Sequence, residues 1–326
     1  MSAPEIRIDQ LTGLRVLLAP GRSQRPEGFA TSANEAKGPA ECPFCEGHEE
    51  RTPPEVYATR PEGEEANSPG WTTRVVPNLY PALAPAEDDP RVPPELFVSR
   101  PADGAHEVIV NGPEHVTAMA ELDEAQFGAA VATWRERMRA HSDAAYVQLI
   151  VNEGKGAGAS LPHTHAQLYA LPFVPASVAR ERERAGAYRE SAGGNSLLGD
   201  VLVEEVRRRE RLIAIDEEAA LICPWASRFP YEMRVIPRSD RDRFEDDDTG
   251  AAMIRTALRA LAARFDGSPE LNLWVRTAPH GAEHFHWHVD IAPRLSIKAA
   301  FEFATGVDIV TYSPERAAAD LREALG

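Results

Sequence analysis

The stretch Glu153–Pro172, EGKGAGASLPHTHAQLYALP, places a glycine-rich loop directly before two histidines that are separated by one residue. If residues 166–171 form a β-strand, alternate side chains share one face, so that His163, His165 and Gln167 point the same way. Three polar side chains in a row make a poor core but a good binding site. The stretch therefore predicts a functional site at the start of this strand.

The chemistry of these residues fits a phosphate. Glycines let backbone N–H groups approach an anion closely, and Lys155 adds positive charge to the loop. An imidazole can attack phosphorus and hold the phosphoryl group covalently, which divides one displacement into two steps. A His-x-His pair can also be structural or form half of a metal site. The glycine loop and the trailing glutamine favour the phosphate interpretation over both of these.

The composition is that of a globular chain. Its 326 residues suit one large domain or two fused domains, and 43% of them are hydrophobic and 26% charged. No apolar run reaches the ~18 residues that suggest a membrane span, and residues 1–10 contain no signal-peptide core. Three cysteines cannot form a disulfide framework. We therefore expect a cytoplasmic protein without a membrane partner.

The formal net charge of −16 argues against a nucleic-acid partner, because such a partner requires a basic surface. A bound phosphate would still need local positive charge, so basic residues in loops become candidates. Arg22 and Arg25 follow a strand expected at residues 14–19, and the guanidinium fork suits phosphate oxygens. The alternative is that both are ordinary exposed arginines.

Cys42 and Cys45 form a C-x2-C pair, a spacing that lets one turn aim two thiolates at a zinc ion. The pair could instead be redox-active or simply buried. Because the chain has one such pair, a tetrahedral zinc site needs two more ligands from elsewhere. The candidate histidines are His48, His106, His115 and His163.

Two segments of the chain repeat one order of elements: strand, helix, strand, loop and His-x-His. The first has expected strands at residues 73–77, 107–110 and 146–152, with a helix at 122–141. The second has expected strands at 232–237 and 271–277, a helix at 249–265, and then His284, His286 and His288. We interpret this repeat as a duplicated α+β unit, with halves at residues 1–195 and 196–326.

Several motifs together resemble the galactose-1-phosphate uridylyltransferase family of the histidine-triad superfamily. They are LTGLRVLLAPGRSQRP at 11–26, CPFC at 42–45, VVPNLYPAL at 75–83, NGPEH at 111–115, GASLPHTHAQ at 158–167, and HWH at 286–288 with FEF at 301–303. The motifs cover nearly the whole chain and are specific as a set. The resemblance implies an α+β fold of two tandem histidine-triad-like halves, each an antiparallel sheet with packed helices. It also implies a catalytic first half and a homodimer.

The resemblance implies roles for individual residues. His165, the second histidine of the His-x-His-x-Gln motif, would be nucleotidylated, and Gln167 would hydrogen-bond the transferred phosphoryl group. Attack requires a neutral imidazole whose other nitrogen donates a hydrogen bond, and we expect a backbone carbonyl as its acceptor. The residues that would contact phosphate or nucleotide are Arg22, Arg25, Asn78, Asn152, Gly158 and Ser160.

The resemblance also implies metal sites. The ligands of a structural zinc ion match Cys42, Cys45, His115 and His163. These four make a complete tetrahedral set, and the ion would anchor the strand that presents His165. Some members of the family hold a second divalent metal, iron or zinc, and three of its ligands match Glu181, His286 and His288. A fourth histidine ligand is replaced near Arg276, with His280 and His284 as substitutes.

The expected reaction is a ping-pong nucleotidyl transfer that joins a nucleotide sugar and a sugar 1-phosphate or phosphate through a nucleotidyl-His165 intermediate. Our first hypothesis is UDP-glucose:galactose-1-phosphate uridylyl transfer. Thr164 replaces the usual proline of the uridylyltransferases, and the runs NLYPAL and ALPFVP are similar to the ADP-glucose phosphorylase branch, which uses phosphate as acceptor. A nucleotide-sugar phosphorylase is therefore the second hypothesis. A histidine-triad nucleotide hydrolase is the third, and a non-catalytic zinc-binding module is the fourth.

Overall fold

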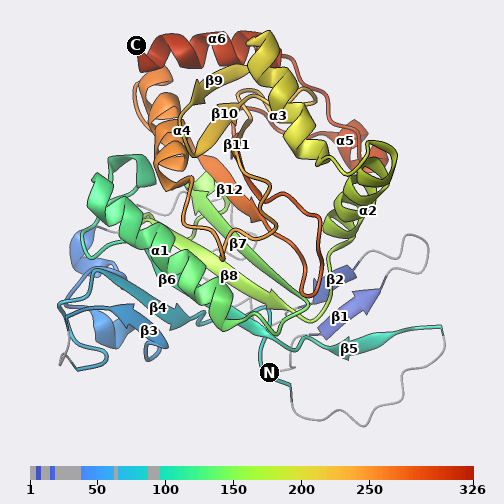
Figure 1. Ribbon diagram of the computed structural model, residues 1–326. Coiled ribbons are helices and arrows are strands. Elements are labelled where there is room, and N and C mark those ends of the chain that lie inside the picture. Colours follow the sequence, from blue (N-terminus) through green and yellow to red (C-terminus); the bar gives the residue numbers. More distant parts are fainter. Residues whose placement is uncertain (1–4, 9–14, 19–37, 62–64, 87–95) are drawn as a thin grey trace.

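The computed structural model describes residues 5–8, 15–18, 38–61, 65–86 and 96–326. A small antiparallel sheet has the order β2-β1-β5, formed by β1 (Glu5–Ile8), β2 (Arg15–Leu18) and β5 (Ser99–Pro101). A large sheet contains ten strands of the described chain (Figure 1). From one edge to the other these are β3 (Tyr57–Thr59), β4 (Thr73–Pro77), β6 (Ala105–Val110), β8 (His165–Leu171), β7 (Tyr146–Glu153), β12 (Leu271–Arg276), β13 (His288–Pro293), β11 (Met233–Pro237), β10 (Ala219–Ile222) and β9 (Leu212–Ile215).

The large sheet has the same strand order when it is followed inward from either edge. One side runs β3-β4-β6-β8-β7 and the other runs β9-β10-β11-β13-β12. In each series a long helix precedes the innermost strand: α1 (Glu124–Ala140) before β7, and α4 (Ala251–Arg264) before β12. This is the pattern expected of a duplicated unit. The two series share one continuous sheet, because β7 and β12 pair antiparallel with Asn152 opposite Asn272. The boundary at residues 195 and 196 stays a prediction.

One face of the large sheet forms the main core. Helices α1 and α4 contact each other and bury their apolar stripes against it. The stripe of α1 is Phe127, Val131, Trp134 and Met138, and that of α4 includes Ile254, Leu258 and Leu261. Residues of this kind at intervals of three and four lie on one side of a helix, which is why the sequence pattern predicted both helices. Asp123 begins α1 by accepting a hydrogen bond from the backbone N–H of Gln126 at 2.7 Å.

The opposite face of the sheet is more polar. Cross-strand partners make one continuous row that runs Val108, Gln167, Ile150, Trp274, Asp290 and Arg234, on strands β6, β8, β7, β12, β13 and β11. Side chains that are directly opposite in a sheet share a face. The candidate catalytic residue Gln167 therefore lies on the same face of the sheet as Trp274, Asp290 and Arg234 of the second half.

Of the other described helices, α6 (Pro314–Leu325) packs against α4 and adds Ala317, Ala318 and Leu321 to the main core. The helices that add no residue to this core are α2 (Ala176–Ser191), α3 (Leu197–Arg208) and α5 (Ala300–Thr305). Short 3-10 turns occur at η2 (Pro39–Glu41), η3 (Glu49–Arg51), η4 (Met119–Glu121) and η5 (Lys155–Ala157). None of the helices in the described ranges has both the length and the apolar character needed to cross a membrane.

Candidate active site and metal centre

His165 is the first residue of β8, and its side chain is buried. Its ring nitrogen Nδ1 lies 2.8 Å from the backbone oxygen of His163. A carbonyl oxygen only accepts hydrogen bonds, so Nδ1 carries the proton and the lone pair of the neutral ring is on Nε2. The expected backbone acceptor is therefore present. The ring of Phe44 packs edge-on against His165, with centroids 5.2 Å apart.

His163 and His165 have different surroundings. The expected alternation holds for His165 and Gln167, which are two residues apart in β8. His163 precedes the strand instead of belonging to it, which corrects the expectation of three side chains on one strand face. Its Nε2 donates to the backbone oxygen of Gly112 at 2.9 Å, which directs Nδ1 toward the cysteine pair.

Gln167 is oriented by two donors that hold its side-chain oxygen. Nε2 of His106 lies 3.1 Å from Gln167 Oε1, and the hydroxyl of Tyr169 donates to the same oxygen at 3.0 Å. Nδ1 of His106 accepts from the backbone N–H of Ala82 at 3.1 Å, so its Nε2 is the protonated nitrogen. With its oxygen engaged, Gln167 presents its NH2 group as a donor. A donor two residues from His165 suits an anionic phosphoryl group.

The glycine loop is shaped by backbone conformations that favour glycine. Gly154 and Gly158 have φ angles of 83° and 90°. Nδ2 of Asn272, on β12, donates to Asn152 Oδ1 and to the backbone oxygen of Ala157, both at 2.8 Å. The loop is thus tied to the junction between the two halves of the sheet.

One amide of the loop already has an acidic partner. The backbone N–H of Gly156 donates to Glu270 Oε1 at 2.9 Å. A β-carbon at Gly156 would lie 2.1 Å from Glu270 Oε2, so a larger residue here would displace this carboxylate. An incoming phosphate would therefore meet the later part of the loop, toward Ser160, where the glycine run ends.

Four predicted metal ligands come together, with one ligand atom of each within 4.8 Å of the others: Cys42, Cys45, His115 and His163. Sγ of Cys45 lies 3.3 Å from His115 Nδ1, and Sγ of Cys42 lies 3.6 Å from His163 Nδ1. Zinc bonds of about 2.3 Å to sulfur and about 2.0 Å to nitrogen, at a tetrahedral angle, place the two ligand atoms about 3.6 Å apart. The donor set and its spacing therefore fit a four-coordinate ion.

Burial of this cluster favours uncharged side chains. It raises the pKa of Cys45 to about 12, helped by the neighbouring Cys42, and it lowers the pKa of His163 to about 4. Two thiolates in such a place need a cation to compensate them. The chemistry of the site thus points to a bound metal ion, in agreement with its geometry.

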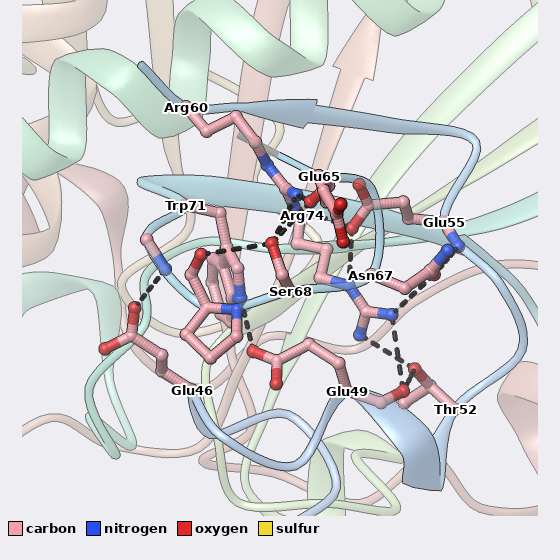
Figure 2. Close-up of polar contacts among 12 residues, drawn as sticks. Glu46, Glu49, Thr52, Glu55, Arg60, Glu65, Asn67, Ser68, Trp71 and Arg74 are labelled. Carbon is pink, nitrogen blue, oxygen red and sulfur yellow. Dashed lines mark hydrogen bonds and ion pairs between the residues drawn. The ribbon is translucent and has the colours of Figure 1, made fainter. Parts of the chain in front are cut away.

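A polar network supports the segment that carries the two cysteines (Figure 2). Arg74, which is buried on β4, donates through Nε to Glu55 at 2.9 Å and through Nη1 to the hydroxyl of Thr52 at 2.8 Å. The indole N–H of Trp71 donates to Glu49 Oε1 at 2.7 Å. These contacts fasten the segment after the cysteine pair to the large sheet.

The expected second metal site is not formed. Glu181 Oε1 lies 3.6 Å from His288 Nε2, but the ring of His286 contacts the hydroxyl of Ser196 at 3.1 Å instead of joining them. Nε of Arg276 lies 3.9 Å from Glu181 Oε2, so a guanidinium group stands on this side of the carboxylate, at the outer limit of an ion pair. In the described part of the chain, the Cys2His2 cluster is the one group with a metal-binding arrangement.

Comparison with known proteins decides the family. Residues 1–175, more than half of the chain, match the family model for the N-terminal domain of galactose-1-phosphate uridyl transferase. The chain belongs to the galactose-1-phosphate uridylyltransferase family. It is therefore an enzyme of a transferase family. Residues 103–325 also match a domain of unknown function, DUF4921.

Relatives of this uridylyltransferase family match the chain along its length. ADP-glucose phosphorylase of Arabidopsis thaliana is 30% identical over 338 residues, which cover 98% of this chain and 93% of the relative. A probable galactose-1-phosphate uridylyltransferase of Drosophila melanogaster is 28% identical over 354 residues, which cover 99% of this chain and 96% of the relative. Among solved structures, that of the Arabidopsis phosphorylase with bound ADP-glucose has a TM-score of 0.74 at 27% identity and covers 98% and 99% of the two chains. A uridylyltransferase structure has a TM-score of 0.79 at 24% identity, covers 98% of both chains, and supports the fold alone.

The structure gathers most of the site residues that the family resemblance named. Asn78 joins the group around Gln167, because its backbone N–H donates to the backbone oxygen of His106 at 2.8 Å and its side chain lies beside the His106 ring. Arg22 and Arg25 lie outside the described residues. Sequence reasoning missed Tyr169 and Asn272, and it considered His106 only as a metal ligand, whereas His106 contacts Gln167 instead. Tyr169 and Asn272 occupy alternate positions of their strands, on the polar face, and this alternation was the available signal.

Proposed function

We propose that the protein transfers a nucleoside monophosphate from a nucleotide sugar to a phosphate oxygen of an acceptor, through a covalent bond to His165. The observation that carries this proposal is the hydrogen bond from His165 Nδ1 to the backbone oxygen of His163. It keeps the proton on Nδ1 and the lone pair on Nε2, which is the nitrogen that can attack phosphorus. The family relationship supports the same class of reaction.

In the first step Nε2 of His165 forms a bond to the α-phosphorus, and the bond from that phosphorus to the bridging oxygen breaks. The sugar 1-phosphate leaves with the electron pair, so it needs little protonation. The ring then carries a positive charge, which the backbone oxygen of His163 stabilises through Nδ1–H. In the second step an acceptor phosphate oxygen attacks the same phosphorus and His165 is released as the neutral ring.

The surrounding groups would hold the charge of the phosphates. The NH2 group of Gln167 and the loop that ends at Ser160 supply donors on the side where His165 lies. Phosphoryl transfer depends mainly on such positioning and electrostatic stabilisation. Arg22 and Arg25 remain candidates for additional phosphate contacts, and a homodimer remains an expectation.

The metal cluster has a structural role in this proposal. Cys42, Cys45, His115 and His163 would hold a zinc ion, which when bound fixes three distant chain segments to one point. Since His163 supplies both a ligand nitrogen and the backbone oxygen that orients His165, the cluster positions the nucleophile without touching the substrate.

Two substrate assignments are compatible with this mechanism. The first is uridylyl transfer from UDP-glucose to galactose 1-phosphate, which the family model and several relatives support. The second is phosphorolysis of ADP-glucose, which is supported by the 30% identity to the Arabidopsis phosphorylase along nearly the whole chain.

Intact-protein mass tests both the mechanism and the assignment. The protein is mixed separately with UDP-glucose, ADP-glucose and GDP-glucose, without acceptor. We expect a mass gain of one nucleoside monophosphate with one of them, and no gain in His165→Ala. Galactose 1-phosphate or inorganic phosphate is then added to the adduct, and the acceptor that discharges it identifies the reaction. A wild-type protein that neither gains mass nor releases free nucleotide would refute covalent catalysis.

A further inference from the structure

A pocket lies on the polar face of the large sheet, beyond the residues assigned to nucleotidyl transfer. Its lining includes Gln148, Ser177, Arg228, Phe229, Trp274 and Arg276. Gln167 is directly opposite Ile150, and Ile150 is directly opposite Trp274. Neighbouring strands are about 4.8 Å apart, so the Trp274 position is about 10 Å from Gln167 across the sheet. The floor of the pocket is therefore formed by β7 of the first half and β12 of the second, which are neighbouring strands of the large sheet (Figure 1).

The charged residues that line the pocket are all basic, although the protein as a whole is acidic. The chain has 51 acidic and 35 basic residues, yet the described lining contains two arginines and no aspartate or glutamate. Both arginines have only distant carboxylate partners: Arg228 is 3.9 Å from Glu232, and Arg276 is 3.9 Å from Glu181. Local positive charge of this kind concentrates anions.

Two further cations gather around the aromatic wall of the pocket. The ring centroid of Phe229 lies 5.8 Å from the guanidinium of Arg228, 5.8 Å from that of Arg294 and 4.9 Å from Nζ of Lys298. Lys298 is paired with Asp308 at 2.5 Å, whereas the side chain of Arg294 has no carboxylate partner within 4.0 Å among the described residues. The cations therefore exceed the carboxylates on this wall.

Neutral donors complete the set. The hydroxyl of Ser177 lies 3.4 Å from Arg276 Nη1, and the amide of Gln148 is part of the same lining. The indole N–H of Trp274 is buried without a hydrogen-bond partner in the described structure. Aromatic faces next to charged and neutral donors suit a small ligand that has both an apolar ring face and an anionic group.

We propose that this pocket binds a phosphorylated sugar, with its phosphate on Arg228 and Arg276 and its ring against Trp274. This inference goes beyond the transfer proposed at His165, because none of the residues assigned to that transfer lines the pocket. The ligand has two sources with the same chemistry. It is either a substrate or product of the transfer reaction, bound next to the transfer site at His165, or a separate effector.

Binding is measured without any nucleotide, so the result does not depend on the proposed reaction. Glucose 1-phosphate is titrated into His165→Ala protein while tryptophan fluorescence and calorimetry are recorded, with inorganic phosphate as a second probe. We expect Arg228→Met and Arg276→Met each to weaken glucose 1-phosphate binding about 10-fold or more, because each removes a charge-assisted contact. We also expect Trp274→Phe to remove the fluorescence change.

The matched control is Arg259→Met, which removes an exposed arginine of α4 on the other side of the sheet. It should bind as the parent does. Arg228 is exposed, so its variant should fold even if Arg276→Met, which loses the contact with Glu181, is less stable. If Arg228→Met and Arg276→Met are folded and bind glucose 1-phosphate with the affinity of the control, the pocket is not an anion site and the proposal is wrong.

Kinetics on the otherwise wild-type chain then distinguish the two sources. If the ligand is a substrate of the transfer, Arg228→Met raises the KM of the sugar phosphate and leaves the rate of adduct formation unchanged. If the ligand is a separate effector, the variant loses binding while the KM for every substrate stays the same. Both results support the proposal that the pocket binds a phosphorylated sugar, and unchanged affinity for glucose 1-phosphate in Arg228→Met contradicts it.

Discussion

Nδ1 of His288 lies 3.2 Å from the backbone oxygen of His286, which repeats in the second half the relationship between His165 and His163. The surroundings of the two rings differ. Nε2 of His288 lies 3.6 Å from a carboxylate oxygen of Asp290, the residue two positions later, where the first half has a glutamine. A phosphate that approached this nitrogen would meet a negative charge instead of an amide donor. The second half thus keeps the contact between the histidine ring and the backbone oxygen, but it places a carboxylate where the first half has an amide donor.

This contrast predicts different outcomes for the two histidines. His165→Ala should abolish the covalent adduct while the melting temperature changes by a few degrees at most. His288→Gln should form the adduct and mainly lose stability, because His288 is buried among charged partners. Intact mass and thermal unfolding are measured on both proteins. An adduct in His165→Ala, or none in a folded His288→Gln, would contradict the assignment of one active half.

The metal cluster predicts a stability effect and a stoichiometry. The protein as purified should contain about one zinc per chain, since the second set of ligands does not gather. Cys42→Ala and His115→Ala should lose that metal and unfold roughly 10 °C or more below wild type, as expected when several kcal/mol are lost. Metal analysis and calorimetry check both statements. Two metal ions per chain, or equal melting temperatures of variant and wild type, would overturn this part of the description.

Glu153 predicts a pH dependence of stability. Burial raises its pKa to about 7, with a further contribution from Glu121 and an opposing hydrogen bond from the N–H of Met119. The folded state therefore binds a proton more tightly than the unfolded state, so stability falls as the pH rises from about 4.5 to about 7. Glu153→Gln removes this dependence. The free energy of unfolding of the variant minus that of wild type should rise by up to about 3 kcal/mol from pH 4.5 to pH 8, as measured by urea unfolding at both pH values. If the difference in the free energy of unfolding between variant and wild type is the same at both pH values, Glu153 has an ordinary pKa.

Asn272 predicts an effect on substrate binding that comes from outside the loop. Asn272→Ala removes the hydrogen bonds to Asn152 and to the backbone of Ala157. The loop should then hold the nucleotide sugar less well, with a KM that rises about 10-fold, equivalent to about 1.4 kcal/mol. Asn195→Ala, which removes an exposed contact with Asp200, is the control. If both variants have the KM of wild type, the β12 asparagine has no part in shaping the loop.

The sequence predicted those features of the fold that depend on local pattern. The strand at 73–77 has the bounds of β4, and the two helices with apolar stripes were predicted to within about two residues at each end. The Cys2His2 set was predicted from the family motifs, which contain all four ligands, and the structure confirms that the four residues form a cluster. These signals lie within short segments or within recognisable motifs.

Long-range relationships could not be read in the same way. The pairing of β7 with β12 joins residues about 120 positions apart, and nothing in either segment names its partner. The failure of the second metal site depends on where Arg276 and the ring of His286 point in three dimensions. The orientation of Gln167 depends on His106, which sequence reasoning had considered only as a metal ligand.

The continuous sheet has a consequence for how such a chain can be divided. In a fragment that ended before the second unit, β7 would be an unprotected edge with free N–H and C=O groups along Ile150–Glu153. Two copies of that fragment could satisfy those groups by pairing their β7 edges antiparallel, as β7 and β12 pair here, and ten strands would again be aligned side by side. Fusion of the two units within one polypeptide replaces that concentration-dependent association. It also frees the second copy to exchange its glutamine for an aspartate, which identical subunits could not do independently.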